Sequence, residues 1–214
     1  LFIGVLVGAR LGHCLFYEPE YYLANPIKIL KVWEGGLASH GGAVAILIAI
    51  WIFVRKYGEK YKFDYWWLFD RIGIATALAG AMIRLGNLMN SEIYGNPTDL
   101  PWGFIFTLRG ETIPKHPTQL YEALSYLALF FLLMWMYKKY LPVLKRGTLF
   151  GIFLTVLFAT RFLIEFVKEP QVSFEQGMAL NMGQLLSIPF ILFGLGLLFY
   201  SIKRGKPAMI NSKS

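Results

Sequence analysis

Three arginines and two glutamates lie inside long apolar stretches of this sequence, where charged side chains are uncommon. They are Arg10, Arg84, Glu122, Arg161 and Glu165. A charge inside a membrane helix is costly and by default marks a functional site. Guanidinium groups bind phosphate and other oxyanions well, and a low dielectric constant strengthens that pairing. The three arginines therefore predict an anion site, with Asn87 one turn from Arg84 on the same helix face.

A structural role for the same charges is the competing interpretation. Arg161 and Glu165 are spaced i, i+4 and can pair on one helix, and Arg84 can pair with Glu122. Such pairs would hold helices together without binding a ligand. Both interpretations can hold at once, because a glutamate can position an arginine for a ligand.

His40 is the candidate proton acceptor, although a single histidine in a helix is more often a core residue. It lies in the string Ser39-His40-Gly41-Gly42, where the glycines permit close approach of a helix or a substrate. The three histidines lack the spacing of metal ligands, so we expect no metal site. Cys14 is the single cysteine, which excludes an internal disulfide, and we interpret it as a small core residue.

Six apolar stretches must position these side chains. The sequence is 56% hydrophobic, 17% aromatic and only 16% charged, whereas soluble domains carry about 25% charged residues. The stretches have nearly the length of a membrane-spanning helix: 1–17, 36–54, 66–88, 119–137, 148–167 and 181–202. We predict an all-α, polytopic transmembrane helical bundle that forms a single domain over residues 1–214. The first stretch begins at residue 1, so we expect that a preceding span is missing.

The connections between these stretches predict the orientation of the protein. Segments 55–65, 138–147 and 203–214 hold twelve Lys/Arg and two acidic residues, whereas the alternate connections hold five and eight. The positive-inside rule places the basic segments, and with them the C-terminus, in the cytoplasm. The net charge of +8 is thereby explained without nucleic acid. The outer connection 89–118 is rich in Gly and Pro and can hold a small structured element.

This topology brings the charged residues to one depth. Arg10, Arg84 and Arg161 each lie within about 10 Å of the outer end of their helices, and His40 lies at a similar depth. A shared site in the outer leaflet follows, and a phospholipid phosphate is the simplest anion at that depth. The pair Asp70-Arg71 lies near the inner end of its span, where we expect it to reach the cytoplasmic interface.

Five strings in order resemble the prolipoprotein diacylglyceryl transferase family over nearly the whole chain. They are GARLG with LFY (8–17), GGLASHGG (35–42), RLGNLMNSEIYG (84–95), HPTQLYE (116–122) and RFLIEF (161–166). The resemblance departs from the family's pattern at some positions. Leu157 and Lys168 stand where many members have Tyr and Arg, and Ile83 and Ser91 replace common glycines.

The resemblance implies a multi-pass enzyme of the bacterial inner membrane, with its site toward the periplasmic leaflet. Such enzymes transfer the diacylglyceryl group of phosphatidylglycerol to the lipobox cysteine thiol of prolipoproteins, the first step of lipoprotein maturation. Glycerol phosphate leaves and a thioether remains. We expect no cofactor, because the phosphate ester of the membrane lipid already supplies the leaving group.

The resemblance also implies roles for individual residues. His40, Arg84 and Arg161 form the implied catalytic set. Arg84 would bind the head group in a site shaped by Asn87, Glu92 and Gly95, and Arg161 would be the second phosphate contact. His40 would lie beside the reacting centre, and Arg10 and Glu165 complete the predicted substrate-binding set.

A non-enzymatic phospholipid or anion transporter is the alternative function. Transport requires polar groups at the midplane or in both halves of the membrane, and the polar set here is one-sided. A serine protease that uses Ser39 or Ser125 is weaker still. Adjacent residues such as Ser39 and His40 point about 100° apart on a helix.

Overall fold

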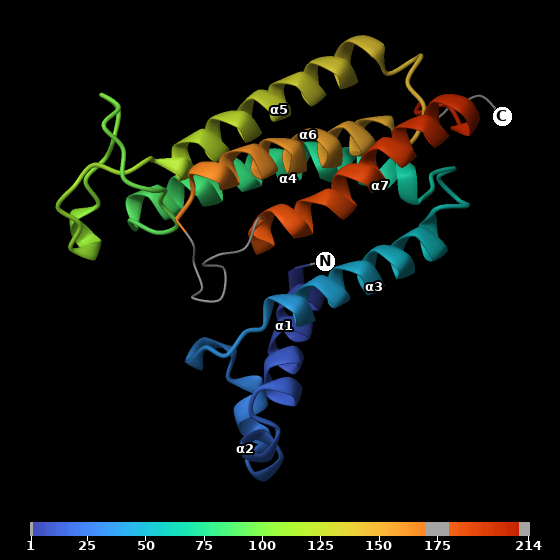
Figure 1. The fold of residues 1–214 in the computed structure, drawn as a ribbon. Coiled ribbons are helices and arrows are strands. Elements are labelled where there is room, and N and C mark those ends of the chain that lie inside the picture. The colour runs from blue at the N-terminus through green and yellow to red at the C-terminus, as the bar shows by residue number, and fades with distance from the viewer. Residues whose placement is uncertain (1, 170–179, 210–214) are drawn as a thin grey trace. The chain divides into compact units, whose positions relative to one another are not determined.

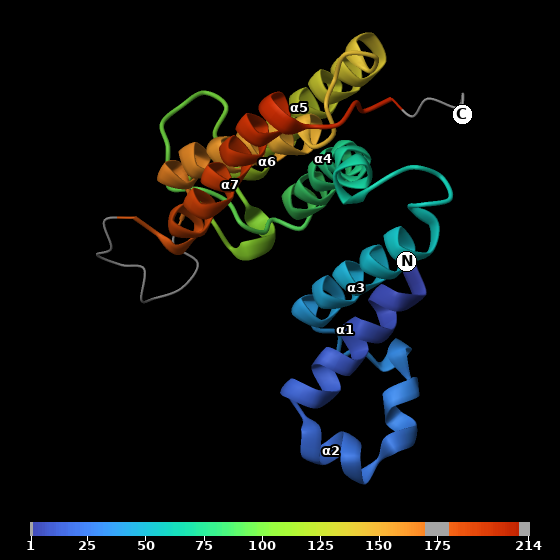
Figure 2. The same cartoon turned by 90° about the vertical axis from the view of Figure 1, so that its right-hand side faces the viewer.

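The computed structural model describes residues 2–169 and 180–209, which fold into α-helices joined by short 3-10 helices and turns (Figures 1 and 2). The chain divides into two compact units, Leu1–Tyr65 and Trp66–Ser214. Each unit is described by itself, and the single membrane domain over 1–214 stays a prediction. The first unit contains α1 (Phe2–Phe16), α2 (Pro19–Ala24) and α3 (Ser39–Tyr57). The second contains α4 (Tyr65–Met89), α5 (Thr118–Tyr140), α6 (Thr148–Ile164) and α7 (Met182–Arg204).

The all-α membrane bundle is confirmed. In the described part of the chain, five helices are long and apolar enough to cross a membrane, namely α3 to α7. They coincide with the predicted stretches from 36–54 onward to within a few residues. The first predicted span corresponds to α1, an apolar helix of 15 residues.

In the first unit, α1 and α3 pack through small residues. A Cβ atom on Gly41 of α3 would meet the carbonyl oxygen of Gly8 and lie 2.9 Å from the Cα of Gly12. The backbone N–H of Ala38 donates to the carbonyl of Ala9 over 2.9 Å. Small residues at a membrane helix interface allow such close backbone approach. The glycines beside His40 therefore serve helix packing.

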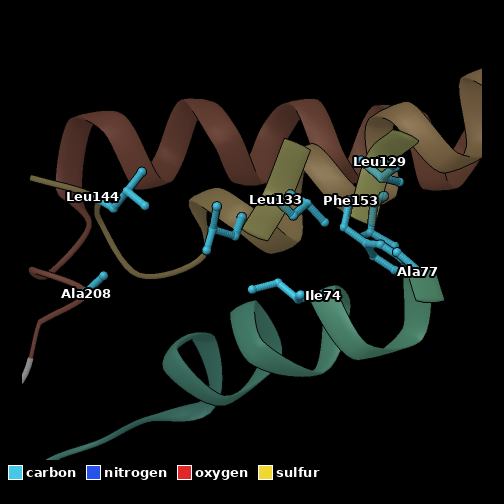
Figure 3. Packing of buried hydrophobic residues seen from close by; sticks show 9 residues of the cluster. Ile74, Ala77, Leu129, Leu133, Leu144, Phe153 and Ala208 are labelled. Carbon is cyan, nitrogen blue, oxygen red and sulfur yellow. The ribbon is translucent and has the colours of Figure 1, made fainter. Parts of the chain in front are cut away.

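In the second unit, a core of aliphatic and aromatic side chains joins α4, α5 and α6. Ile74 and Ala77 of α4 face Leu129 and Leu133 of α5 and Phe153 of α6 (Figure 3). Each of these side chains is at most 6% exposed. The same helices lie side by side with α7 in both views of the fold. This core holds α4, α5 and α6 at fixed distances from one another.

Asp70 corrects one expectation from the sequence. It does not reach the interface but is buried, with 1% of its surface exposed. Its carboxylate accepts hydrogen bonds from the backbone N–H groups of Gly147 (2.8 Å) and Phe150 (2.9 Å) at the start of α6. The first N–H groups of a helix have no partner within it and favour a negative charge. Asp70 is therefore the N-terminal cap of a different helix, and the expectation that it reaches the interface was wrong.

The connection between α4 and α5 is folded around a buried lysine. Backbone bridges join Lys115 to Pro97 and to Phe104, and a 3-10 helix, η3, spans Thr107–Arg109. The ammonium of Lys115 lies 2.8 Å from Glu111 and 3.1 Å from Glu169. Burial lowers the pKa of Lys115, but these two carboxylates outweigh burial and raise it. The cluster ties the connection to the segment that follows α6.

Candidate functional site

The centre of the candidate site is an ion pair between α4 and α5. Nε of Arg84 lies 2.8 Å from Oε2 of Glu122. The side chain of Arg84 is 13% exposed and that of Glu122 is fully buried. Both lie near the ends of α4 and α5 that the outer connection joins. The pairing of Arg84 with Glu122, considered as the structural interpretation, is confirmed.

A second cation, Lys168, approaches the other side of Glu122. Its Nζ lies 3.5 Å from Oε1 of Glu122 and 3.4 Å from Oε2 of Glu165. Lys168 is 2% exposed, so the two glutamates are held in the interior by a buried ammonium. Among the described residues Glu165 pairs with Lys168 and not with Arg161, so this part of the competing structural interpretation was wrong. The 3-10 helix Glu165–Val167 ends α6 and turns Lys168 back toward Glu165.

Asn87 and Glu92 extend the network outward from Arg84. Oδ1 of Asn87 lies 3.5 Å from Nη1 of Arg84, and its Nδ2 donates to Oε2 of Glu92 over 3.1 Å. Oε1 of Glu92 lies 3.5 Å from Nη2 of Arg109 in η3. The structure thus joins three predicted site residues in one chain of contacts. The sequence drew no attention to Arg109, which belongs to an otherwise ordinary turn.

Gly95 lies where no side chain fits. A Cβ atom at this position would lie 2.7 Å from Cβ of His116 and from Cγ2 of Thr118, and closer still to the carbonyl oxygen of Val167. Its backbone N–H donates to the carbonyl of His116 over 2.8 Å. Gly95 therefore brings the end of α6, the start of α5 and the outer connection together. It shapes the site through backbone packing.

Arg161 lies on α6 and is partly exposed. Within the described part of the chain it forms no hydrogen bond or ion pair. The hydroxyl of Tyr126 interacts electrostatically with Glu122, Arg84 and Arg161, which places the two arginines around one tyrosine. Of these two arginines, only Arg84 faces a carboxylate among the described residues.

In the first unit, Arg10 is buried and its guanidinium binds backbone carbonyls. Nε donates to Ile29 (3.0 Å), Nη2 to Lys28 (2.6 Å), and Nη1 to Gly35 and Gly36. These bonds fasten the connection between α1 and α3 onto α1. The substrate-binding role of Arg10 stays a prediction, and its observed partners are all neutral.

His40 is the second residue of α3 and is exposed. Its ring stacks on Tyr17 with centroids 5.6 Å apart, and Tyr17 stacks in turn on His13 at 5.4 Å. Tyr17 lies in one of the strings that resemble the family, but its type and position in the sequence indicated no role for it. His40 and the Arg84 network belong to different units, so the place of His40 beside the reacting centre stays a prediction.

A partly buried arginine, Arg84, that faces a fully buried glutamate at one end of an apolar helical bundle is the candidate anion site of a membrane protein. A family model described as prolipoprotein diacylglyceryl transferase matches residues 1–200. A relative from Tolumonas auensis is 55% identical over 95% of this chain and 77% of its own length. Relatives from Porphyromonas gingivalis (51%) and Bacteroides fragilis (48%) also cover 95% of this chain, and 75% and 76% of their own lengths. All three are named phosphatidylglycerol–prolipoprotein diacylglyceryl transferase.

The chain belongs to the prolipoprotein diacylglyceryl transferase family. The resemblance stated from its five strings is thereby confirmed.

Proposed function

We propose that this chain transfers the diacylglyceryl group of phosphatidylglycerol to the cysteine thiol of a prolipoprotein lipobox. The names of relatives at 48–55% identity support this function, and none of them favours the transporter alternative. The observation that carries the proposal is the partly buried Arg84, held by the fully buried Glu122 and by Asn87. The charge distribution supports an inner-membrane protein with this site toward the outer leaflet and the C-terminus in the cytoplasm.

In the proposed reaction, the cysteine sulfur attacks the glyceryl carbon that carries the phosphate. The new S–C bond forms as the C–O bond to the phosphate breaks, and the electron pair leaves with glycerol phosphate. The thiol proton passes to His40, which returns it to solvent. A thiol with a pKa of about 8.5 reacts as thiolate, and a positioned base contributes about 10²–10⁴-fold.

The arginines stabilise the departing phosphate. Charge builds up on its oxygens as the C–O bond breaks, and donors already in place stabilise that charge. Glu122 and Asn87 would hold Arg84 in position before the lipid arrives, and Arg161 would supply the second guanidinium. Gly95 would hold the backbone around Glu92 and Thr118 in place. The chain's own residues thus bind the head group and balance its charge.

Mass spectrometry of a lipobox peptide tests the proposed function. The full chain in nanodiscs that contain phosphatidylglycerol is incubated with the peptide, and a matched peptide with serine in place of cysteine is the control. We expect a mass gain of one diacylglyceryl unit on the cysteine peptide, with release of glycerol phosphate. No gain under conditions where the Tolumonas auensis relative modifies the peptide would overturn the proposal.

A further inference from the structure

An apolar groove of about 500 Å³ runs along α7 beside the start of α4. It is lined by Trp66, Leu192, Phe193, Gly196, Leu197 and Tyr200. Of these side chains, Leu192, Phe193 and Tyr200 are each about half exposed or more. The hollow lies over Gly196, where a Cβ atom would meet nothing within 4 Å. The groove is therefore the space that a larger side chain at position 196 would fill on this face of α7.

The same face of α7 ends in two cations. Lys203 and Arg204 follow Tyr200 at i+3 and i+4, so they continue the groove-lining stripe. Both side chains are exposed, and Nζ of Lys203 lies 4.2 Å from the centroid of the Phe199 ring. The sequence from 180 to 209 contains no acidic residue. An anionic group at this end of the groove would meet two positive charges and no carboxylate from α7.

The groove lies at the opposite end of the bundle from the Arg84 network. Trp66 precedes Arg84 by 18 positions on the continuous helix α4, which separates them by about 27 Å along the axis. That distance is close to the hydrocarbon thickness of a bilayer, about 30 Å. A lipid in the groove therefore belongs to the other leaflet and is not the lipid at the arginines.

We propose that this groove binds one acyl chain of an anionic phospholipid whose phosphate pairs with Lys203 and Arg204. Basic pockets between membrane helices bind anionic head groups, because each Lys or Arg near the surface attracts them. Trp66 and Tyr200 are residue types that favour the membrane–water interface. The occupant is a lipid because the apolar stripe is continuous with the cationic end along one membrane helix.

Photolabelling of the full chain in nanodiscs tests this site. The nanodiscs consist of phosphatidylcholine with a small fraction of phosphatidylserine that carries a diazirine on one acyl chain. Peptide mapping by mass spectrometry locates the label. We expect labelling of Trp66 and of residues 192–200, about tenfold stronger than with the same diazirine on phosphatidylcholine, because two cations contribute to the preference.

Gly196→Leu is the variant that fills the groove. The open space at this position accepts the side chain, and leucine is a better helix former than glycine, so the fold is not weakened. We expect labelling of residues 192–200 to fall by about tenfold. The double variant Lys203→Gln/Arg204→Gln should abolish the preference for phosphatidylserine. Its control, Lys138→Gln/Lys139→Gln, removes two exposed cations from the last turn of α5 and should leave the preference intact.

Three results would overturn the site. They are equal labelling by the two lipids, unchanged labelling in Gly196→Leu, and crosslinks that join the groove to another segment of this chain. The readout does not depend on diacylglyceryl transfer, which is measured separately in nanodiscs that contain phosphatidylglycerol. A failure of the groove is therefore distinguishable from a failure of the proposed function.

Discussion

Arg10 and Arg84 are both arginines of apolar helices, yet their surroundings differ. Arg10 is 3% exposed and gives its donors to four backbone carbonyls of one connection. Arg84 faces a carboxylate and an amide, and these side chains belong to a longer network. The depth and burial of an arginine thus do not distinguish an arginine that holds the chain together from one that can bind a ligand. The nature of its partners does.

The largest effect that this comparison predicts is on Arg84. We expect Arg84→Ala to lower diacylglyceryl transfer by about 10²–10³-fold, because a preorganised donor to the departing phosphate is lost. Transfer is measured as thioether formed on the lipobox peptide. Retention of full activity would contradict the head-group role.

A second variant separates this effect from unfolding. Arg84→Ala leaves the buried Glu122 charged and with only Lys168, at 3.5 Å, as its partner. Loss of one partner of a buried ion pair is strongly destabilising. Arg84→Ala/Glu122→Gln removes that charge, so we expect it to fold better than Arg84→Ala while transfer stays low. Recovery of transfer in the double variant would mean that Arg84 acts only through stability.

The next effect concerns Lys168, which lies between Glu122 and Glu165. We expect Lys168→Met to reduce the free energy of unfolding by about 3–5 kcal/mol, because Glu165 loses its ammonium partner and Glu122 keeps only Arg84. Denaturant titration in detergent measures the change. Lys168→Arg keeps the charge and is the matched control, and equal stability of the Met and Arg variants would refute the buried ion cluster.

Arg10 provides the contrasting variant. We expect Arg10→Met to cost about 1–3 kcal/mol, because carbonyls of the connection lose their donors, and to speed proteolysis within residues 25–36. Transfer per folded molecule should fall far less than in Arg84→Ala. If transfer falls equally in both variants, Arg10 binds substrate as the sequence analysis predicted, and the comparison between the two arginines fails.

The smallest effect is on how the stability of a connection depends on pH. Carboxylates that bind a cation titrate at acidic pH, whereas backbone carbonyls that bind a cation do not. The hydrogen bond from Lys115 lowers the pKa of Glu111 below its ordinary 4.5, and a bond from the Tyr94 hydroxyl lowers it further. A depressed carboxyl pKa stabilises the folded connection above pH 4.5, and this contribution is lost as the pH falls through the lower value.

Hydrogen exchange of residues 97–113 measures the effect. Relative to the intrinsic amide exchange rate at each pH, we expect exchange to rise on acidification below pH 4.5. In Glu111→Gln we expect this ratio to become independent of pH over the same range. The connection fastened by Arg10 contains its own ion pair, in which Lys28 lowers the pKa of Glu34. It is therefore compared in the Glu34→Gln variant, where we expect no matching change. Equal acid sensitivity of the two connections would contradict this difference.

Much of the fold was predictable from the sequence, because apolar length alone marks a membrane helix. Helices α3 to α7 fall where apolar stretches were expected. The site was predictable only in part. The contacts of Arg84 with Glu122 and of Asn87 with Glu92 connect residues that composition or the family's strings had already singled out.

The rest of the fold and of the site could not be predicted, because it depends on contacts between residues far apart in the sequence. Lys168 follows the end of α6 and appears as an ordinary loop cation, yet it pairs with Glu122, 46 positions earlier. Asp70 looks like an interfacial residue until its partners, 77 and 80 positions later, are known. Periodicity reports which face of one helix is apolar. It does not report which distant N–H or carboxylate that face will meet.

The cap that Asp70 forms on α6 has a consequence at the far end of both helices. α4 and α6 run in the same direction from this cap. Arg84 lies about 21 Å from Asp70 along α4, and Arg161 lies about 17 Å from Phe150 along α6. If α6 slipped by one turn along α4, about 5.4 Å, both N–H groups would move away from the Asp70 carboxylate. The carboxylate would then have no hydrogen-bond donor from α6 in an apolar interior. One carboxylate near the start of α4 thus sets the register of two guanidinium groups near the far ends of α4 and α6.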